Sequence, residues 1–407
     1  MNNNIASAGA PLQDVCASNY APLPVTLVRG SGVFVWDDNG RRYLDMMSAY
    51  SAVSHGHAHP ALVAALAEQA QKLAIVSRAF STDRLEPFLR RACEMTGMDM
   101  ALPMNTGAEA VETAIKAARK WAYRAKGVAE DECEIIACEG NFHGRTLGAI
   151  ALSTERQYRE GFGPFMPGVR IVPFGDADAL EHAITPNTGA FLVEPMQGEA
   201  GIRIPTEGYL ARCAEICRNH GVLLIADEVQ TGLGRTGRLL ACDHEQVKPD
   251  GLVLGKALGG GLLPVSLFLA CRDVMRVFTP GDHGSTFGGN PLSSAVGLVA
   301  LELLEKEQLI ERSAQLGEYL LAGLRSVHSP LIREVRGKGL WCGVEFDPQR
   351  VSARRIAERL LEAGILTKDA HETVIRFAPP LLIEREQIDS ALEPFRQVIH
   401  KCGAHES

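Results

Sequence analysis

An acid and a lysine each stand at the end of a short apolar run in the middle of the chain. Asp227 directly follows the run Val222–Ala226, and Lys256 follows the run Leu252–Leu254 with only Gly255 between them. If these runs are neighbouring strands of an open α/β sheet, both side chains lie beyond the carboxyl ends of the strands, where such sheets bind ligands. Because lysine and aspartate are rarely buried without a partner, the pair predicts a structural ion pair or a reactive site, unless the lysine simply begins an exposed loop.

Pyridoxal phosphate is the cofactor whose chemistry needs these two residue types. It requires a lysine that bonds to it covalently and an acid against its pyridine nitrogen. A lysine removed from water also has the lowered pKa that such bonding and proton transfer need. The segment Asn105-Thr106-Gly107-Ala108 opens a predicted helix, whose free N–H groups and dipole suit the cofactor's phosphate. The intact set argues against a protein that only binds or regulates.

The elements that must position these residues lie in the segment 134–271, where short apolar runs alternate with segments of helical period. The strand candidates are Ile135–Cys138, Val169–Pro173, Ala190–Val193, Val222–Ala226, Leu252–Leu254 and Val265–Ala270. Several are apolar at every position, as in strands that are covered on both faces. The alternation predicts an α/β fold with a large, mostly parallel sheet. Further helices are expected from Pro60, over 108–125 and over 292–307.

The two ends of the chain predict a second, smaller α+β domain. Residues 1–30 form an irregular arm in this interpretation, and residues 32–44 form a β-hairpin. Residues 310–407 alternate helices with three short strands. We therefore expect an N-terminal arm and hairpin (1–45) that belongs to the small domain, a large domain that binds pyridoxal phosphate (46–308), and a C-terminal small domain (309–407).

Charge and composition favour a cytoplasmic protein that acts on small molecules. The 407 residues include 41 basic and 49 acidic side chains and no long basic block, which disfavours nucleic-acid binding. The apolar stretch 251–271 contains three consecutive glycines and Pro264, so it predicts strand, loop and strand rather than a membrane helix. We expect no signal peptide. The ten cysteines contain no Cys-x-x-Cys pair, which indicates reduced thiols and no zinc site.

Two further motifs are alternatives to weigh against this interpretation. Gly232-Leu-Gly-Arg-Thr-Gly237 fits the dinucleotide pattern G-x-G-x-x-G, but no strong helical period follows it, which disfavours a nicotinamide site. His55, His57 and His59 occupy every second position, a spacing that would place all three on one side of a strand and could bind a metal. The intervening glycine and the following proline place them in a loop, so we expect no metal.

The chain resembles the class III aminotransferases of fold type I over residues 33–400, and most of all the members that act on ornithine. Eight blocks carry the resemblance, in order along the chain: Ser48–Val53, Leu102–Gly107, Asn141–Thr146, Glu194–Gly201, Asp227–Gly232, Gly255–Leu258, His283–Pro291 and Arg376–Pro380. One block alone would be a weak signal, whereas eight in order are specific.

The resemblance implies a role for each residue of a cofactor site and a homodimer, with a larger homo-oligomer left open. Lys256 would bind pyridoxal phosphate and transfer the proton, and Asp227 would pair with the ring nitrogen. The other implied cofactor contacts are Phe142 against the ring, Gln230 at the phenolic oxygen, the backbone of Gly107 and Ala108 at the phosphate, and Thr286 at the phosphate of the neighbouring subunit.

The same resemblance implies transfer of the δ-amino group of ornithine to 2-oxoglutarate. Tyr50 and Arg145 would hold the carboxylate far from the reacting carbon. Arg376 would hold the carboxylate next to that carbon in the keto acid, and Glu199 would neutralise Arg376 when ornithine is bound. The alternative is that Glu199 and Arg376 are ordinary surface charges.

One position departs from the family pattern. Relatives that act on ornithine often carry an aromatic residue after Ser-Arg-Ala-Phe, whereas Ser77-Arg78-Ala79-Phe80 is followed here by Ser81. A smaller side chain would widen the pocket at the amine end of the substrate. N-Acetylornithine, 4-aminobutyrate and lysine are therefore alternative amino donors.

Overall fold

A seven-stranded sheet forms the centre of the larger lobe. The structure, a computed structural model, describes residues 15–404, so the first 14 residues of the expected arm lie outside the described part. The strand order is β4-β10-β9-β8-β7-β5-β6. The bounds are β4 Met100–Met104, β5 Glu134–Cys138, β6 Val169–Val172, β7 Thr188–Val193, β8 Leu223–Asp227, β9 Gly251–Leu254 and β10 Ser266–Ala270. Strands β5 to β9 are parallel, and β10 is antiparallel to both of its neighbours. The predicted mostly parallel sheet is confirmed.

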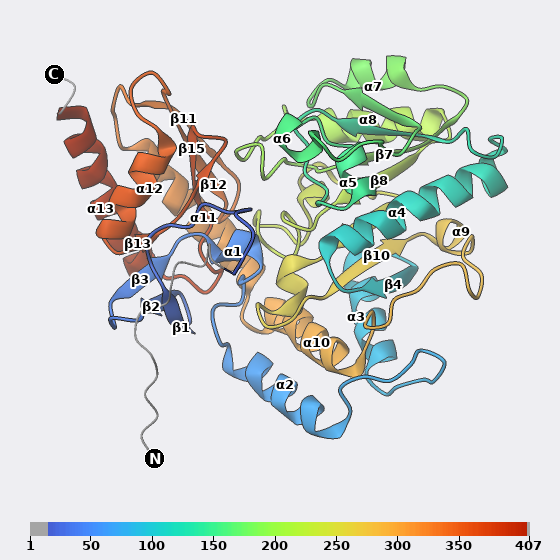
Figure 1. The fold of residues 1–407 in the computed structure, drawn as a ribbon, viewed down its shortest axis with the longest axis horizontal. Helices are drawn as coiled ribbons and strands as arrows, with labels where there is room; N and C mark the ends of the chain where they lie inside the picture. The colour runs from blue at the N-terminus through green and yellow to red at the C-terminus, as the bar shows by residue number, and fades with distance from the viewer. Residues whose placement is uncertain (1–14, 405–407) are drawn as a thin grey trace.

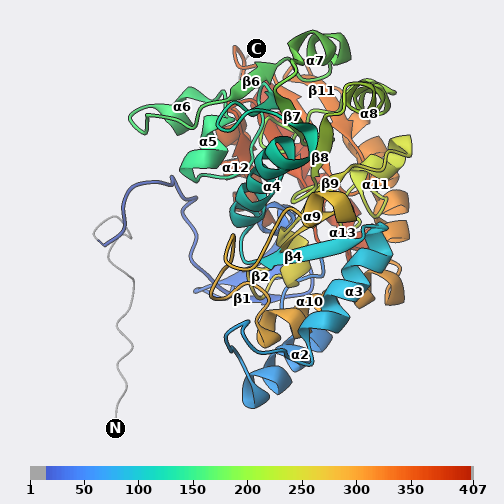
Figure 2. The ribbon, with the colours of Figure 1, turned by 90° about the vertical axis from the view of Figure 1, so that its right-hand side faces the viewer.

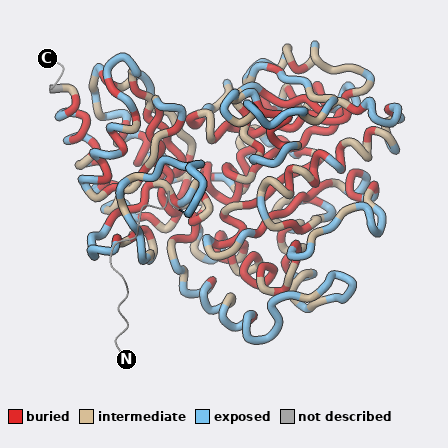
Figure 3. Tube along the Cα trace, viewed as in Figure 1, coloured by how far each residue is buried: buried red, intermediate tan, exposed pale blue. Residues whose placement is uncertain are grey.

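Helices cover both faces of this sheet (Figures 1 and 2). Alternate residues of each strand point to opposite faces. Ile135, Leu192 and Ile225 accordingly pack with helix α4 (Gly107–Trp121), whereas Ile136, Phe191 and Leu224 pack with α8 (Tyr209–Asn219). Strands β7 to β10 are buried along their whole length (Figure 3), which explains why their sequences are apolar at nearly every position. Helix α7 (Ala177–Ala183) lies beside α8.

Three helices extend the larger lobe below the sheet as drawn in Figure 1. Helix α10 (Pro291–Lys306) packs against α2 (Pro60–Lys72) and α3 (Leu85–Thr96). Shorter helical segments are α1 Ser48–Ser51, α5 Leu147–Ala151, α6 Arg156–Arg159, η3 Ala241–Glu245, η4 Lys256–Gly259 and α9 Arg272–Met275. Among the described residues, no helix is both long enough and apolar enough to cross a bilayer.

The second lobe combines both ends of the described chain, and Figure 1 shows them side by side. One sheet, in the order β1-β2-β3-β13, contains the predicted hairpin. Its strand β13 pairs in parallel with β3, so that Ile365 lies opposite Leu44. The other sheet has the order β11-β12-β15-β14. The elements of this lobe are β1 Leu27–Ser31, β2 Phe34–Asp37, β3 Arg42–Asp45, α11 Leu309–Arg325, β11 Ile332–Gly337, β12 Cys342–Phe346, α12 Ala353–Glu362, β13 Ile365–Leu366, β14 Asp369–Ala370, β15 Val374–Phe377 and α13 Arg385–Ala404. The boundaries expected at 45/46 and 308/309 stay a prediction.

Among the elements not expected from the sequence are β1, α3, β4 and β11. Strand β4 contains Pro103, which disrupts a strand pattern because it donates no ladder hydrogen bond. The strand lies at the edge of the sheet, where a proline is tolerated. Strand β11 carries three charged residues and is also an edge strand, so it has no apolar alternation.

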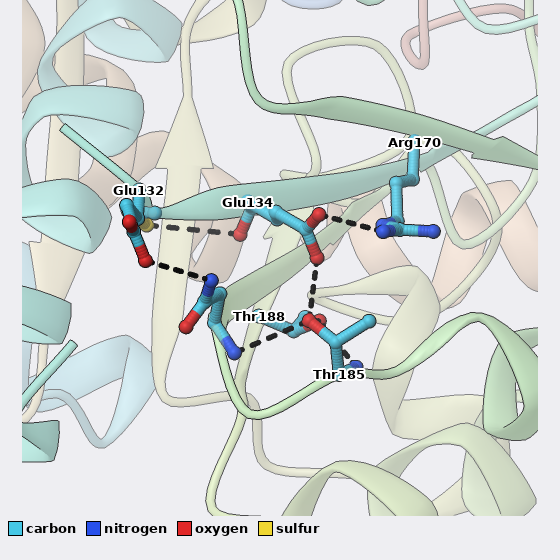
Figure 4. Close-up of polar contacts among 7 residues, drawn as sticks. Glu132, Glu134, Arg170, Thr185 and Thr188 are labelled. Atoms are coloured by element: carbon cyan, nitrogen blue, oxygen red, sulfur yellow. Dashed lines mark hydrogen bonds and ion pairs between the residues drawn. The ribbon is translucent and has the colours of Figure 1, made fainter. Parts of the chain in front are cut away.

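A polar cluster links the amino ends of three neighbouring strands (Figure 4), whereas Asp227 lies at the carboxyl end of β8. Glu134 accepts hydrogen bonds from Arg170 (2.7 Å) and from the Thr185 hydroxyl (2.6 Å). The Thr188 hydroxyl accepts from the Thr185 backbone N–H at 2.9 Å. The cluster therefore links the starts of β5, β6 and β7.

Candidate active site

Strands β8 and β9 bring Asp227 and Lys256 to one cavity. Asp227 is the last residue of β8, and Lys256 begins the short turn η4 two residues after β9 ends. The two strands are hydrogen-bonded neighbours. The cavity has a volume of about 170 Å³. Its lining includes six of the seven predicted cofactor residues: Gly107, Ala108, Phe142, Asp227, Gln230 and Lys256.

Lys256 is held in an unusual backbone conformation. Its φ of 43° lies in the left-handed region. This conformation costs energy for a residue with a side chain, and residues that adopt it are concentrated at functional sites. Burial lowers the pKa of Lys256, while the carboxylates of Glu199 and Asp227 oppose that shift. The lowered pKa leaves more of the amine neutral, and a neutral amine can bond to a carbonyl carbon or take up a proton.

Asp227 is buried and paired with His143. The His143 Nδ1 lies 2.7 Å from Asp227 Oδ2, and the Val229 N–H donates to the other carboxylate oxygen at 3.1 Å. Burial alone would lower the pKa of His143, but the hydrogen bond and charge of Asp227 outweigh burial and raise it. Sequence reasoning missed His143, although it stands next to Phe142 in one of the recognised blocks.

Glu194 is a second buried acid that sequence reasoning gave no role. It follows β7 directly, as Asp227 closes β8, and this position was the available signal. Its carboxylate accepts hydrogen bonds from the backbone N–H groups of Phe142 (2.8 Å) and Gly198 (3.1 Å). Burial raises the pKa of Glu194 to about 7, His143 opposes the shift and Asp227 adds to it. Glu194 thereby fixes the backbone on two sides of the cavity.

The amino end of helix α4 forms an anion cradle on the cavity wall. A capping box between Thr106 and Glu109 begins the helix. The first backbone N–H groups of a helix have no partner within it and attract anions. A Cβ atom on Gly107 would lie 2.9 Å from Val229 Cγ1, and one on Gly144 would lie 2.7 Å from the Ala108 Cβ. Glycine at positions 107 and 144 therefore allows the backbone of this wall to pack closely against its neighbours.

These residues fit pyridoxal phosphate. The cavity offers a lysine with a lowered pKa, a buried acid, an anion cradle and the aromatic ring of Phe142. Two buried polar atoms of its lining, Gln230 Oε1 and His143 Nε2, have no hydrogen-bond partner among the described residues. Buried polar atoms are normally paired, so these two are available to a bound group.

Glu199 and Arg376 form an ion pair beside the cavity. Arg376 Nη1 lies 2.7 Å from Glu199 Oε1, and Arg376 Nη2 lies 3.4 Å from Glu199 Oε2. The Gln230 side-chain amide also donates to Glu199 at 3.2 Å, which links the pair to the cavity lining. Burial would raise the pKa of Glu199, but Arg376 lowers it to about 2. Because Arg376 is buried, the two are a coupled pair rather than separate surface charges.

Tyr50 and Arg145 stand in different surroundings. The Arg376 guanidinium lies 5.0 Å from the ring centroid of Tyr50, and the Tyr50 hydroxyl accepts from Lys368 Nζ at 3.3 Å. Arg145 is exposed and stacks on Tyr158, 3.8 Å from the centroid of that ring. Lys368 and Tyr158 were not expected at the site. A joint grip of Tyr50 and Arg145 on one carboxylate stays a prediction.

Tyr50 belongs to a left-handed helical turn. Four consecutive residues, Ser48–Ser51, have φ between 44° and 74°. Arg235 is buried and donates to the hydroxyls of Ser48 (3.2 Å) and Ser54 (2.8 Å), on either side of Tyr50. Arg235 comes from the G-x-G-x-x-G segment, which is an interior support here. Such strained turns persist only where their surroundings hold them.

Thr286 and Ser81 lie on the surface of this chain, outside the lining of the cavity. Thr286 is exposed, and its neighbour Phe287 keeps 57% of its surface exposed. Ser81 is also exposed and lines a separate groove of about 740 Å³ beside α3. Their expected roles, Thr286 at the cofactor phosphate of a neighbouring subunit and Ser81 at the amine end of the substrate pocket, stay predictions.

The three histidines near residue 57 point to separate partners. His55 Nε2 lies 2.9 Å from the Ala300 carbonyl oxygen, His57 Nε2 lies 2.7 Å from Asp45, and His59 Nε2 lies 3.0 Å from Glu307. Within residues 15–404, no group of three metal-ligating side chains is gathered. The histidines instead connect their loop to β3 and α10.

Comparison with known proteins places this geometry in a family. The family model for class III aminotransferases matches residues 15–399. An ornithine aminotransferase of Bacillus subtilis (strain 168) is 56% identical over 386 residues, covering 95% of this chain and 96% of the relative. Among solved structures, the ornithine aminotransferase of Toxoplasma gondii ME49 is 44% identical with a TM-score of 0.95, covering 97% of this chain and 94% of that one.

A further solved structure is that of the acetylornithine aminotransferase from Elizabethkingia anophelis. It is 46% identical with a TM-score of 0.87 and covers 96% of this chain and 97% of that one. The sheet topology, the lysine and acid at the ends of neighbouring strands, and the match over nearly the whole length agree with one another. The chain belongs to the class III aminotransferases, a family of fold-type I enzymes that depend on pyridoxal phosphate.

Proposed function

We propose that this enzyme transfers the δ-amino group of ornithine to 2-oxoglutarate, which gives glutamate 5-semialdehyde and glutamate. The observation that carries the proposal is the Glu199–Arg376 ion pair (2.7 Å) beside the Lys256 cavity. The names of the bacterial and Toxoplasma relatives support the same amino donor.

The ion pair suits two substrates of different charge. The δ-carbon of ornithine carries no carboxylate, so an unpaired Arg376 would be a buried, uncompensated cation; Glu199 removes that penalty. In 2-oxoglutarate the reacting carbon is next to a carboxylate. Arg376 would bind that carboxylate in a two-pronged contact once the Glu199 side chain has turned away. The enzyme would thus use one site for both halves of a ping-pong cycle.

The chain's own residues supply positioning and proton transfer. Pyridoxal phosphate, when bound, supplies a carbonyl that bonds to the substrate amine and a ring that accepts an electron pair. Lys256 Nζ would take the proton from the δ-carbon of ornithine, which its lowered pKa favours. Asp227, fixed by His143, would hold a proton on the ring nitrogen. The N–H groups of Gly107 and Ala108 would bind the phosphate.

The remaining contacts involve the outer part of the site. Tyr50 and Arg145 would bind the carboxylate farthest from the reacting carbon in both substrates, Phe142 would stack on the cofactor ring, and Gln230 would reach its phenolic oxygen. Thr286 would contact the phosphate in the neighbouring subunit of a homodimer. The exposed apolar side chains of Phe80 (67%) and Phe287 (57%) support such an interface. Ten unpaired cysteines support a reducing compartment, the cytoplasm.

Half-reactions with purified enzyme test the proposal. Ornithine, N-acetylornithine, 4-aminobutyrate and lysine are supplied singly as amino donors, and the loss of the cofactor's visible absorbance is followed. Ornithine should react fastest, and the amine-loaded enzyme should then react with 2-oxoglutarate. Lys256→Ala should lose the donor reaction by at least about 10²-fold while still binding the cofactor. A protein that stays colourless with added pyridoxal phosphate would exclude the proposal.

A second candidate amino donor is N-acetylornithine. Two observations favour it: Ser81 replaces the aromatic residue that is common at this position, and the Elizabethkingia anophelis relative carries that name. The same half-reactions decide between the two donors, since an acetylornithine enzyme would react faster with the acetylated donor. A matched variant, Ser81→Tyr, should then shift the preference towards ornithine.

A further inference from the structure

Two arginines of the smaller lobe reach the same loop of the larger lobe. Across three neighbouring strands, Arg336 of β11 lies opposite Gly343 of β12, and Gly343 lies opposite Arg376 of β15. Directly opposed residues of adjacent strands point to the same face of a sheet. The loop that carries Glu199 approaches this face. Arg376 binds the Glu199 side chain, while Arg336 binds the loop backbone.

Arg336 donates three hydrogen bonds to two backbone carbonyls. Its Nε lies 3.1 Å from the Gly201 oxygen and 2.9 Å from the Ile202 oxygen, and its Nη2 lies 2.7 Å from the Gly201 oxygen. Its Nη1 contacts the carboxylates of Glu334 (2.6 Å) and Glu345 (2.5 Å). Because two carboxylates compensate its charge, Arg336 acts on the loop as a hydrogen-bond donor and not as a free cation near the substrate.

The loop is tightly turned and closely seated. The Gly201 and Ile202 N–H groups donate to the Gly198 carbonyl at 3.1 and 3.2 Å, and Gln197 pairs with Arg203 across the base of the turn. Gly201 has a φ of +93°, and a Cβ atom there would lie 3.0 Å from Val374 Cγ2. A side chain at position 201 would therefore push the loop away from the sheet.

We propose that Arg336 is a positioning residue for the Glu199–Arg376 pair. It holds the backbone at Gly201 and Ile202 in place, so the pair opens by rotation of the Glu199 side chain alone and closes again at the same distance. This inference rests on the proposed exchange between ornithine and 2-oxoglutarate. It assigns the amino-donor specificity partly to a residue that touches neither substrate.

Loss of Arg336 should affect the two half-reactions unequally. A loosened loop withdraws Glu199 from Arg376 and leaves that guanidinium exposed to the α-carboxylate of ornithine, which would bind in the wrong direction. The 2-oxoglutarate half-reaction needs Arg376 free of Glu199, so it does not depend on the loop in the same way. A positioning role is therefore identified by a slower ornithine half-reaction with little change in the 2-oxoglutarate half-reaction, and not by an equal loss in both.

The test compares Arg336→Met, Arg336→Lys and the control Arg333→Met in the holoenzyme. Arg333 is an exposed arginine of the same strand that pairs with Asp347 at 2.9 Å. Arg336→Met should lower kcat/KM of the ornithine half-reaction by about tenfold to a hundredfold, as expected for lost hydrogen bonds to a charged donor, and leave the 2-oxoglutarate half-reaction within about threefold. Arg336→Lys should recover part of the loss, and Arg333→Met should change neither rate.

Hydrogen exchange measured by mass spectrometry gives a readout independent of turnover. Amides of residues 198–202 should exchange faster in Arg336→Met than in the parent, with no such change in Arg333→Met. Equal losses in both half-reactions, or unchanged exchange in the loop, would overturn the inference. If Arg336→Met does not fold, the same two measurements on Arg336→Lys decide. If the parent enzyme does not react with ornithine, the proposed function fails, whereas the exchange result still reports on the anchoring of the loop.

Discussion

His143 and Asp227 form a buried pair in the lining of the active-site cavity, with 2.7 Å between His143 Nδ1 and Asp227 Oδ2. The histidine keeps the carboxylate in one orientation. Burial opposes a charged His143, but the hydrogen bond and charge of Asp227 raise the pKa of His143 and so favour its protonated form. A carboxylate held in this orientation could pair with the ring nitrogen of a bound cofactor.

Replacing His143 should weaken cofactor binding more than folding. In His143→Asn, Asp227 loses a charge-assisted hydrogen bond, so the affinity for pyridoxal phosphate and the turnover rate should each fall by about tenfold or more. Equilibrium dialysis and initial rates measure the two effects. His220→Asn, at an exposed position, is the control and should change neither. Full affinity and rate in His143→Asn would contradict the assigned role of the pair.

The raised pKa of Glu194 predicts a pH-dependent stability. In the folded protein the pKa is about 7, against 4.5 for the ordinary side chain, so the folded state binds this proton more tightly than the unfolded state. The unfolding free energy should therefore fall as pH rises from about 4.5 to 7, and remain level in this contribution above 7. The fall should be on the order of 3 kcal/mol at most.

Glu194→Gln removes this titration and should flatten the pH dependence of stability over that range. Urea unfolding at pH 5, 6 and 7 gives the comparison. Glu139, the acid that follows β5, provides the control Glu139→Gln, which should leave the slope unchanged. A slope in Glu194→Gln equal to that of the parent would show that another group titrates.

Gly107→Ala should reduce the affinity for pyridoxal phosphate. The added methyl group would meet Val229 at 2.9 Å and shift the backbone N–H groups of the anion cradle. We expect a loss of about tenfold, which ultraviolet-visible titration of the apoenzyme measures. Gly403→Ala, which adds a methyl group in open space on α13, should bind the cofactor normally. Unchanged affinity in Gly107→Ala would argue against a phosphate at this helix end.

Glu134→Gln should lower stability without affecting catalysis. The cluster in Figure 4 lies at the amino ends of β5, β6 and β7, whereas the cavity lies at the carboxyl ends of β8 and β9. Arg170 holds the pKa of Glu134 below its usual value, with burial opposing. Its stabilising effect is therefore present at neutral pH and is lost as pH falls through the lowered pKa. We expect a loss of about 1 kcal/mol at pH 7, measured by urea unfolding, and unchanged half-reaction rates.

The sequence predicts much of this structure because its central strands are buried on both faces. Runs such as Val222–Ala226 are apolar at every position, which distinguishes them from amphipathic helices and from polar loops. The residues that follow each run lie at the ligand-binding edge of the sheet. Asp227 and Lys256 were found in this way from physical reasoning alone. Residues such as Tyr50 and Arg376 required the family resemblance, since nothing in their local spacing indicates a site.

Other features depend on distant contacts that no local pattern encodes. His143 and Arg336 were missed because each is defined by a partner elsewhere in the chain: Asp227 for the former and the Gly201 carbonyl for the latter. Strand β4 was missed because Pro103 suits an edge strand only, and edge position is a property of the assembled sheet.

The parallel pairing of β3 with β13 has a consequence for the order of folding. Leu44 is synthesised early, yet its partner Ile365 emerges from the ribosome only after the whole central sheet has been made. During synthesis the β3 edge of the hairpin stays unpaired until residue 365 has been made, so the cofactor lobe can fold first. A nascent chain stopped before residue 365 should therefore carry a folded central sheet and an open strand edge, a natural target for chaperones.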